Sequence, residues 1–243
     1  MDVREYIKNN ILIFDGAMGT MLQQKGLQIG ENPEVFGLKN PDKLIEIHKL
    51  YLEAGSNVIT TNTFGANELK LDKLGYTVEE VVDNAINMAK KAIEESDKSK
   101  PRFVALDLGP IGEMLEPIGT LSFDRAYEIF KRQAIQGEKS GANLIIIETM
   151  MDLYEAKAAV LAAKEAGIDP KTGERLPIFA TVIYDEKGKL LTGGDVPAVI
   201  AMLEGLRVDA LGINCGMGPE QMLPILEDIL KYASVPIIVK PNA

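Results

Sequence analysis

The chain contains a single cysteine, Cys215, at a position that would suit a chemical role. Cys215 follows the short apolar segment Leu211–Asn214 and precedes a glycine-rich turn. A strand that ends in such a turn can present a thiolate to a cleft as a nucleophile or a soft metal ligand. The alternative is that Cys215 is a small buried apolar residue. The thiol alone does not decide between the two.

Two acidic residues also follow apolar segments. Asp15 precedes Gly16 and Ala17, and glycine there allows backbone amides to approach a ligand while the carboxylate stays free for an ammonium group. An ordinary Asp-Gly turn is the alternative. Glu148 ends the run 144–147 and points either into a cavity, where it needs a cationic partner, or to the solvated rim. Together the two carboxylates suit the amino group of an amino acid.

The only histidine, His48, is expected to be structural. It lies in the predicted helix Lys43–Ala54, on the outside of the expected fold and away from the ends of the strands. With one histidine, the sequence excludes a histidine-based catalytic triad and a site built from several histidines.

Short β-branched runs alternate with helical patterns, which is typical of a parallel sheet. We predict strands over seven segments: Ile11–Phe14, Asn57–Thr61, Phe103–Asp107, Leu144–Glu148, Ile178–Ile183, Ala210–Asn214 and Val235–Lys240. This alternation indicates either a (β/α) barrel or a doubly wound sheet. In a barrel, chemistry gathers at the carboxyl ends of the strands. The polar residues expected there are Asp15, Thr61, Asn62, Asp107, Glu148, Asn214, Cys215 and Asn242.

Helix signals lie between the strands. The segment Thr77–Glu95 carries apolar residues at three- and four-residue spacing. Asp152 and Glu155 resemble a capping box that opens a helix over Leu153–Ala166, with Gly167 as its stop. Asp195 and Gly218 mark two further starts. Pro224 predicts that the last helix is kinked or starts one turn late.

Composition restricts the class of protein. The chain has 243 residues, 46% of them apolar, and a net charge of -10. This is an ordinary globular composition in one expected domain, residues 1–243. The acidic balance argues against a nucleic-acid partner. No apolar run approaches the roughly 20 residues of a membrane span, and no signal peptide opens the chain, so we expect a cytoplasmic protein without a membrane partner.

Five motifs in order resemble the homocysteine S-methyltransferase family, and within it the amino-terminal homocysteine-binding domains of bacterial cobalamin-dependent methionine synthases. They are Phe14–Leu22 (FDGAMGTML), Thr60–Phe64 (TTNTF), Ile147–Met150 (IETM), Gly212–Cys215 (GINC) and Lys240–Ala243 (KPNA). The resemblance implies a (β/α)8 TIM barrel that binds homocysteine. It also implies methyl transfer from methylcobalamin, and ultimately from 5-methyltetrahydrofolate, to give methionine.

The resemblance also implies roles for individual residues. Cys215 becomes a zinc ligand, and Asn242 a group that approaches the metal when substrate is absent. Asp15 and Glu148 would bind the homocysteine amino group.

The remaining implied roles concern the rest of the substrate. Gly16 and its neighbour Ala17 would bind the carboxylate, and Thr61 and Asn62 would line the pocket. Zinc would hold the thiol of homocysteine as a thiolate, the form that attacks a methyl group.

The chain departs from the family pattern in its metal ligands. It lacks the Cys-Cys pair that, with Cys215, completes the zinc site in the family, and it ends after the seventh predicted strand. We therefore expect a C-terminally incomplete barrel without its eighth strand and inactive alone. Its folate- and cobalamin-binding domains would lie elsewhere in a longer enzyme. Alternatives are a betaine- or S-methylmethionine-homocysteine S-methyltransferase, or a non-catalytic small-molecule-binding barrel.

Overall fold

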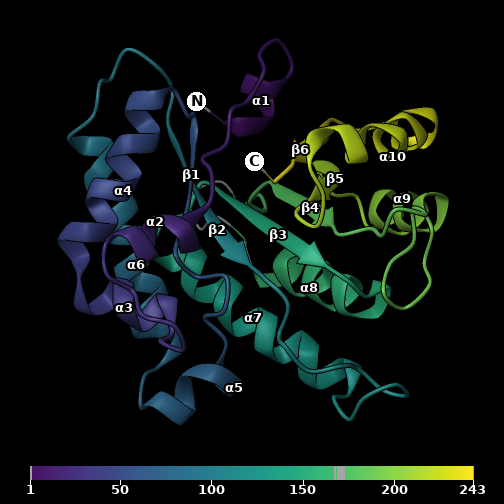
Figure 1. The fold of residues 1–243 in the computed structure, drawn as a ribbon, viewed down its shortest axis with the longest axis horizontal. Helices are drawn as coiled ribbons and strands as arrows, with labels where there is room; N and C mark the ends of the chain where they lie inside the picture. Colours follow the sequence, from purple (N-terminus) through teal and green to yellow (C-terminus); the bar gives the residue numbers. More distant parts are fainter. Residues whose placement is uncertain (1, 167, 169–172, 243) are drawn as a thin grey trace.

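The computed structural model describes residues 2–166, 168 and 173–242. Its described part contains one parallel sheet with the strands in chain order (Figure 1). The strands are β1 (Val58–Thr60), β2 (Phe103–Leu108), β3 (Leu144–Met150), β4 (Ile178–Val182), β5 (Ala210–Asn214) and β6 (Ile237–Lys240). Six of the seven predicted strands are confirmed, with ends that agree to within two residues.

Helices surround the sheet on three sides (Figure 1). They are α1 (Val3–Ile7), α2 (Met18–Gln24), α3 (Pro33–Lys39), α4 (Pro41–Ala54), α5 (Glu68–Leu71), α6 (Val78–Glu94), α7 (Phe123–Lys139), α8 (Leu153–Ala166), α9 (Val196–Gly205) and α10 (Pro219–Tyr232), with a 3-10 turn at Asp72–Leu74. No helix in the described part of the chain is both long enough and apolar enough to span a membrane.

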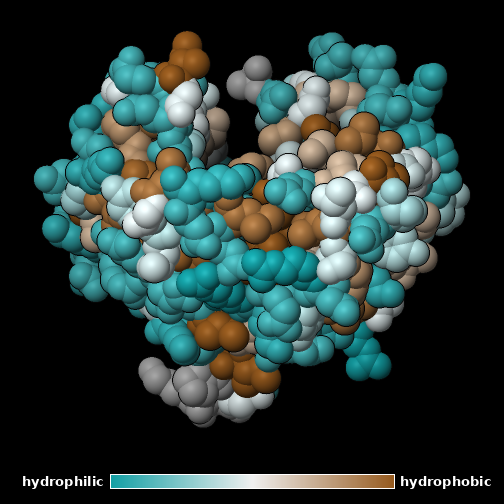
Figure 2. All heavy atoms as spheres, turned by 90° about the horizontal axis from the view of Figure 1, so that it is seen from below, coloured by the Kyte–Doolittle hydropathy of each residue, from teal (hydrophilic) through white to brown (hydrophobic). Residues whose placement is uncertain are grey.

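Both faces of the sheet are buried, which explains its nearly continuous apolar strands. Residues such as Ile145 and Ile147 pack outward against the helices. Residues such as Leu144, Ile146 and Phe179 form a separate inner cluster. The space-filling view shows a largely hydrophilic exterior and a notch between two lobes (Figure 2). The fold is an incomplete barrel whose concave side has its own apolar core.

The predicted first strand, Ile11–Phe14, is wrong as a strand. The segment makes one parallel bridge, from Phe14 to Val58, and the side chains of Ile11 and Ile13 are 86% and 52% exposed. A strand needs a continuous ladder of backbone hydrogen bonds, and no described strand pairs with its outer side. Even so, the two ends of the sheet meet, because the Lys240 ammonium lies 5.4 Å from the centre of the Phe14 ring.

Most helix signals are confirmed. Thr77 caps α6 through the Glu80 amide. Asp152 accepts a hydrogen bond from the Glu155 amide at 2.8 Å, which is half of the predicted capping box; the Glu155 carboxylate instead accepts from the Ile111 amide at 2.7 Å. Asp195 caps α9 through the Ala198 amide at 3.1 Å. The predicted stop of α8 at Gly167 lies outside the described residues.

The last helix, α10, begins at Pro219, where the Gly218 amide donates to the Gln221 side chain. It continues through Pro224 without interruption, so the predicted late start is wrong. The interior proline lacks an N–H for the carbonyl four residues earlier. The helix tolerates this because its buried residues Met222, Ile225 and Ile229 still pack on the sheet.

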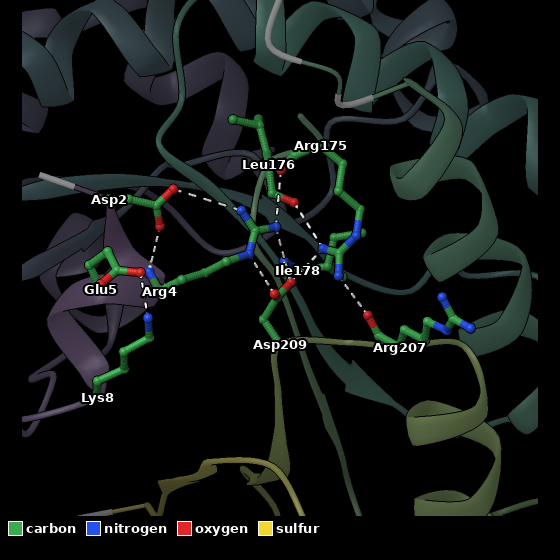
Figure 3. A network of polar contacts seen from close by, with 9 residues as sticks. All are labelled: Asp2, Arg4, Glu5, Lys8, Arg175, Leu176, Ile178, Arg207 and Asp209. Atoms are coloured by element: carbon green, nitrogen blue, oxygen red, sulfur yellow. Dashed lines mark hydrogen bonds and ion pairs between the residues drawn. The ribbon is translucent and has the colours of Figure 1, made fainter. Parts of the chain in front are cut away.

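The short helix α1 is fixed to the inner core and to the amino end of β5. Val3 is 1% exposed and packs in the inner cluster. The Arg4 guanidinium donates to the carboxylate of Asp209 at 2.6 Å and to the carbonyl of Arg175 at 3.0 Å. Arg175 also pairs with Asp209, so the carboxylate lies between two guanidinium groups (Figure 3). Burial raises the pKa of Asp209, but the hydrogen bonds from both arginines outweigh it and hold the pKa below its usual range.

Candidate functional site

A cavity of about 580 Å³ opens at the carboxyl ends of the strands and extends into the inner core. Seven of the eight residues proposed from sequence line it: Asp15, Gly16, Ala17, Thr61, Glu148, Cys215 and Asn242. The eighth, Asn62, is not part of the cavity wall; it is 5% exposed and donates to the Pro33 carbonyl at 2.8 Å. The fold thus gathers residues from segments that are far apart in the sequence.

Asp15 is held at the cavity wall by β1. The Thr60 amide donates to one carboxylate oxygen at 2.8 Å and the Thr60 hydroxyl to the other at 2.6 Å. Burial raises the pKa of Asp15 to about 7, even though the hydrogen bonds from Thr60 and the charge of Lys240 act to lower it. A carboxyl group with this pKa exists in both protonation states at neutral pH and responds to a nearby cation.

Glu148 has a cationic partner within the chain. The Lys240 ammonium donates to the Glu148 carboxylate at 2.6 Å, and both side chains are largely buried. Burial lowers the pKa of Lys240, but the neighbouring carboxylates, Glu148 first, raise it above its usual value. From the sequence we expected a buried Glu148 to need a cationic partner, and we expected the amino group of the substrate to be that partner. The pair joins β3 to β6, 92 residues apart, and no local pattern predicts it.

The sequence placed Asp107 among the polar residues at the carboxyl ends of the strands but assigned it no role. It lines the cavity, is 5% exposed, and its Oδ1 atom has no hydrogen-bond partner among the described residues. Burial and the negative charge of Glu148 raise the pKa of Asp107 well above its usual value. Its position at the end of an apolar run, like that of Glu148, could have identified Asp107 as a candidate site residue from the sequence.

Cys215 is positioned by a reciprocal pair of hydrogen bonds. The Asn214 side chain accepts from the Thr149 amide at 2.9 Å and donates to the Thr149 hydroxyl at 2.7 Å. The same Asn214 amide group lies 3.4 Å from the Cys215 sulfur. Thr149 and Cys215 both have positive φ, 63° and 56°, which is uncommon for residues with a side chain and strained for a β-branched one. The bonds therefore stabilise a strained pair of turns beside the thiol.

Asn242 lies near this turn because the backbone is tied to it. The Cys215 amide donates to the Lys240 carbonyl at 3.1 Å, and the Asn242 amide donates to the Met217 carbonyl at 3.0 Å. Both Cys215 and Asn242 line the cavity.

The donor set does not fit a complete zinc centre. A catalytic zinc commonly has three protein ligands. Within residues 2–166, 168 and 173–242, no three cysteine, histidine or acidic side chains are arranged to hold a metal, and the sequence contains one cysteine. Cys215 is therefore a single soft donor, with Asn242 as a weak neighbour.

The segment after Asp15 has a tightly packed backbone. A side chain at Gly16 would place its first carbon 3.0 Å from the Tyr51 ring. The Tyr51 hydroxyl donates to the Ala17 carbonyl at 3.0 Å. Helix α2 starts after Ala17, which offers no side-chain acceptor to the first amides of the helix. Of this helix, only its first residue, Met18, lines the cavity beside Gly16 and Ala17.

The predicted structural role of His48 agrees with its position. The residue is fully buried in α4, away from the cavity lining, and neither ring nitrogen has a hydrogen-bond partner among the described residues. Burial lowers its pKa to about 3, so the ring is neutral.

Comparison with known proteins identifies the family. The family described as homocysteine S-methyltransferase matches residues 12–243. Methionine synthases of Mycobacterium leprae and Mycobacterium tuberculosis are 31% and 30% identical to the chain over 251 aligned residues, which cover 100% of this chain and 21% of each relative. The chain thus spans about a fifth of the length of these curated relatives.

Solved structures share the fold. The homocysteine methyltransferase MmuM from Escherichia coli superposes in its metallated form with a TM-score of 0.86 at 22% identity, covering 99% of this chain and 87% of that one. Its apo form gives a TM-score of 0.78 at 24% identity, covering 98% and 84%. From the family match and its extent, the chain belongs to the homocysteine S-methyltransferase family.

Proposed function

We propose that the cavity binds L-homocysteine and that residues 1–243 form the homocysteine-binding barrel domain of a methyltransferase that produces methionine. The observation that carries the proposal is the combination of one thiol, Cys215, with carboxylates in a single cavity of a chain from this family. Such a cavity complements a small molecule that carries both an ammonium group and a soft sulfur atom.

The proposed orientation uses both ends of the substrate. Asp15 and Glu148 face its amino group. The backbone at Gly16 and Ala17, which line the cavity, binds its carboxylate. These contacts hold the amino acid by its invariant part and leave its side chain free to extend toward the thiol side of the cavity.

The other two residues proposed from sequence contribute differently. The Thr61 hydroxyl contacts that of Thr63 at 2.7 Å at the cavity wall. Asn62, directed at the Pro33 carbonyl, supports the wall from behind. We propose that Thr61 shapes the pocket and that Asn62 positions the β1 end.

We further propose that Cys215 is one ligand of a zinc ion in the intact enzyme and that Asn242 approaches the metal when substrate is absent. Because the described residues do not fit a complete zinc site, the other ligands would come from outside this chain. The 243-residue chain should then bind zinc weakly or not at all, and should not transfer methyl groups alone. Stoichiometric zinc that is lost on Cys215→Ser would show that the ligand set is misjudged.

The proposed methyl donor is methylcobalamin, recharged from 5-methyltetrahydrofolate by folate- and cobalamin-binding domains of the same enzyme. The support is the resemblance to two methionine synthases over the whole of this chain. A cytoplasmic location follows from the same proposal.

Titration of L-homocysteine into the chain tests the binding proposal. We expect saturable binding that weakens when Asp15 is replaced by Asn, with L-homoserine, which lacks the sulfur, as a comparison ligand. Absence of saturable binding would refute it. For the donor, a longer protein that includes the following sequence should methylate homocysteine from methylcobalamin. Transfer from betaine or S-methylmethionine instead would refute the cobalamin assignment, and no transfer from any of the three would favour a non-catalytic binding barrel.

A further inference from the structure

Three carboxylates from three separate segments line the cavity: Asp15, Asp107 and Glu148. Two of them have partners within the chain. Both oxygens of Asp15 accept hydrogen bonds from Thr60, and Glu148 pairs with the Lys240 ammonium. Asp107 differs, because its buried Oδ1 atom has no partner among the described residues. A buried acceptor without a partner is costly, and among the described residues with such an atom only Asp107 lines the cavity.

The charges around Asp107 define what could bind it. The carboxyl group is 5% exposed, and the charged groups that act on it are Glu148 on β3, Lys240 on β6, Asp15 after the Phe14 bridge and Glu34 on α3. Lys240 is the single cation among these groups, and it already pairs with Glu148. An ionised Asp107 would therefore add a negative charge to a group in which carboxylates already outnumber the single ammonium.

We propose that Asp107 supplies the ionised carboxylate that faces the ammonium group of the amino acid bound in this cavity. The inference rests on the proposed function and deepens it, since it adds Asp107 to the residues that select an amino acid. In the empty cavity, burial and Glu148 keep the proton on the Asp107 carboxyl. The arriving ammonium replaces that proton and makes a charge-assisted hydrogen bond in a desolvated site.

This role gives Asp107 a specific signature among ligands. Only a ligand that carries an ammonium group benefits from the carboxylate. A homocysteine analogue without its amino group leaves Asp107 protonated and unpaired, whereas an analogue without its carboxylate still engages it. Asp15 already accepts hydrogen bonds from Thr60, and Glu148 already pairs with Lys240. We therefore expect these two carboxylates to contribute less to the selectivity for an ammonium group.

The test compares three ligands on the full 243-residue chain by ligand-observed NMR: L-homocysteine, its analogue without the amino group, and its analogue without the carboxylate. The variant Asp107→Asn keeps the shape of the side chain and removes its charge. We expect it to weaken both ammonium-bearing ligands by about tenfold or more, and to leave the affinity for the deamino analogue within about twofold. Wild type should also release more protons than Asp107→Asn when homocysteine binds near pH 7, where Asp15, with a pKa of about 7, releases part of a proton in both proteins.

A matched control is Glu155→Gln, because Glu155 is another buried carboxylate with a raised pKa but does not line the cavity. It should leave all three affinities unchanged. Thermal unfolding should show Asp107→Asn folded, and Asp107→Ser provides a second variant if it is not. Equal weakening of all three ligands, or none, would overturn the role of Asp107. A wild-type chain that binds none of them would overturn the proposed function itself and this inference with it.

Discussion

Replacement of Asp15 by Asn should stabilise the folded chain at alkaline pH while weakening ligand binding. Burial raises the pKa of Asp15 from 3.8 to about 7. Well below pH 3.8 the carboxyl is protonated in both the folded and unfolded states, so its burial does not lower the stability there. As the pH rises toward 7 and above, the unfolded state ionises freely and the folded state does so only at a cost. The free energy of unfolding therefore decreases as the pH rises from 3.8 to about 7.

The size of the effect follows from the shift. About three pKa units correspond to about 4 kcal/mol at a pH where both states are ionised. The neutral Asn side chain fits the same two contacts, since its oxygen accepts from the Thr60 amide and its amide group donates to the Thr60 hydroxyl, which can rotate. We expect Asp15→Asn to gain about 2 to 4 kcal/mol at pH 8.5, or roughly 5 to 10 °C in melting temperature, and little near pH 4.

The assay is denaturant and thermal unfolding of both proteins from pH 4 to pH 8.5, paired with homocysteine titration at pH 7. Glu155→Gln is the matched control, because burial raises the pKa of Glu155 to about 7 as well. It should show a similar stability gain without a loss of affinity. If Asp15→Asn were less stable at pH 8.5, or followed the same pH dependence as wild type, the burial account of Asp15 would be refuted.

Three further predictions concern residues that affect the stability of the fold. His48→Leu should stabilise the chain near pH 5. Burial lowers the pKa of His48 from 6.5 to about 3, so the wild-type chain loses stability as the pH falls through this range. Equal pH profiles of the two proteins in urea unfolding would contradict this. Asn214→Ala should lower the free energy of unfolding by about 2 kcal/mol, because it breaks the hydrogen bonds that hold the turn at Cys215; an unchanged urea midpoint would argue against that support. Arg4→Ala should release α1 from Asp209 and speed proteolysis of the amino terminus, and cleavage at the wild-type rate would show that the contact does not fix the helix.

Much of the fold could be predicted because it is encoded locally. Runs such as 144–147 are apolar on both faces and short, which favours a buried parallel strand. Caps such as Asp152 and Asp195 mark helix starts because their side chains bond to amides three residues later. The predictions fail where contacts with residues distant in the sequence determine the local structure. Ile11–Phe14 has strand composition but only one bridge, and α10 tolerates Pro224 because tertiary packing offsets the missing bond.

The site was predictable in its location but not in its internal pairing. Polar residues that follow strands could be assigned to one edge of a barrel, and the cavity brings most of them together. The ion pair of Lys240 with Glu148 and the unpartnered oxygen of Asp107 depend on which side chains face one another across strands. Sequence patterns determine which face a residue occupies but not its partner across the cavity.

The most direct test of the central claim is a crystal structure of the chain saturated with L-homocysteine. We predict the amino group within hydrogen-bonding distance of the cavity carboxylates, the substrate carboxylate at the backbone of Gly16 and Ala17, and the sulfur on the Cys215 side. An empty cavity at saturating ligand, or homocysteine bound at another place, would contradict the assignment of this cavity as the homocysteine site.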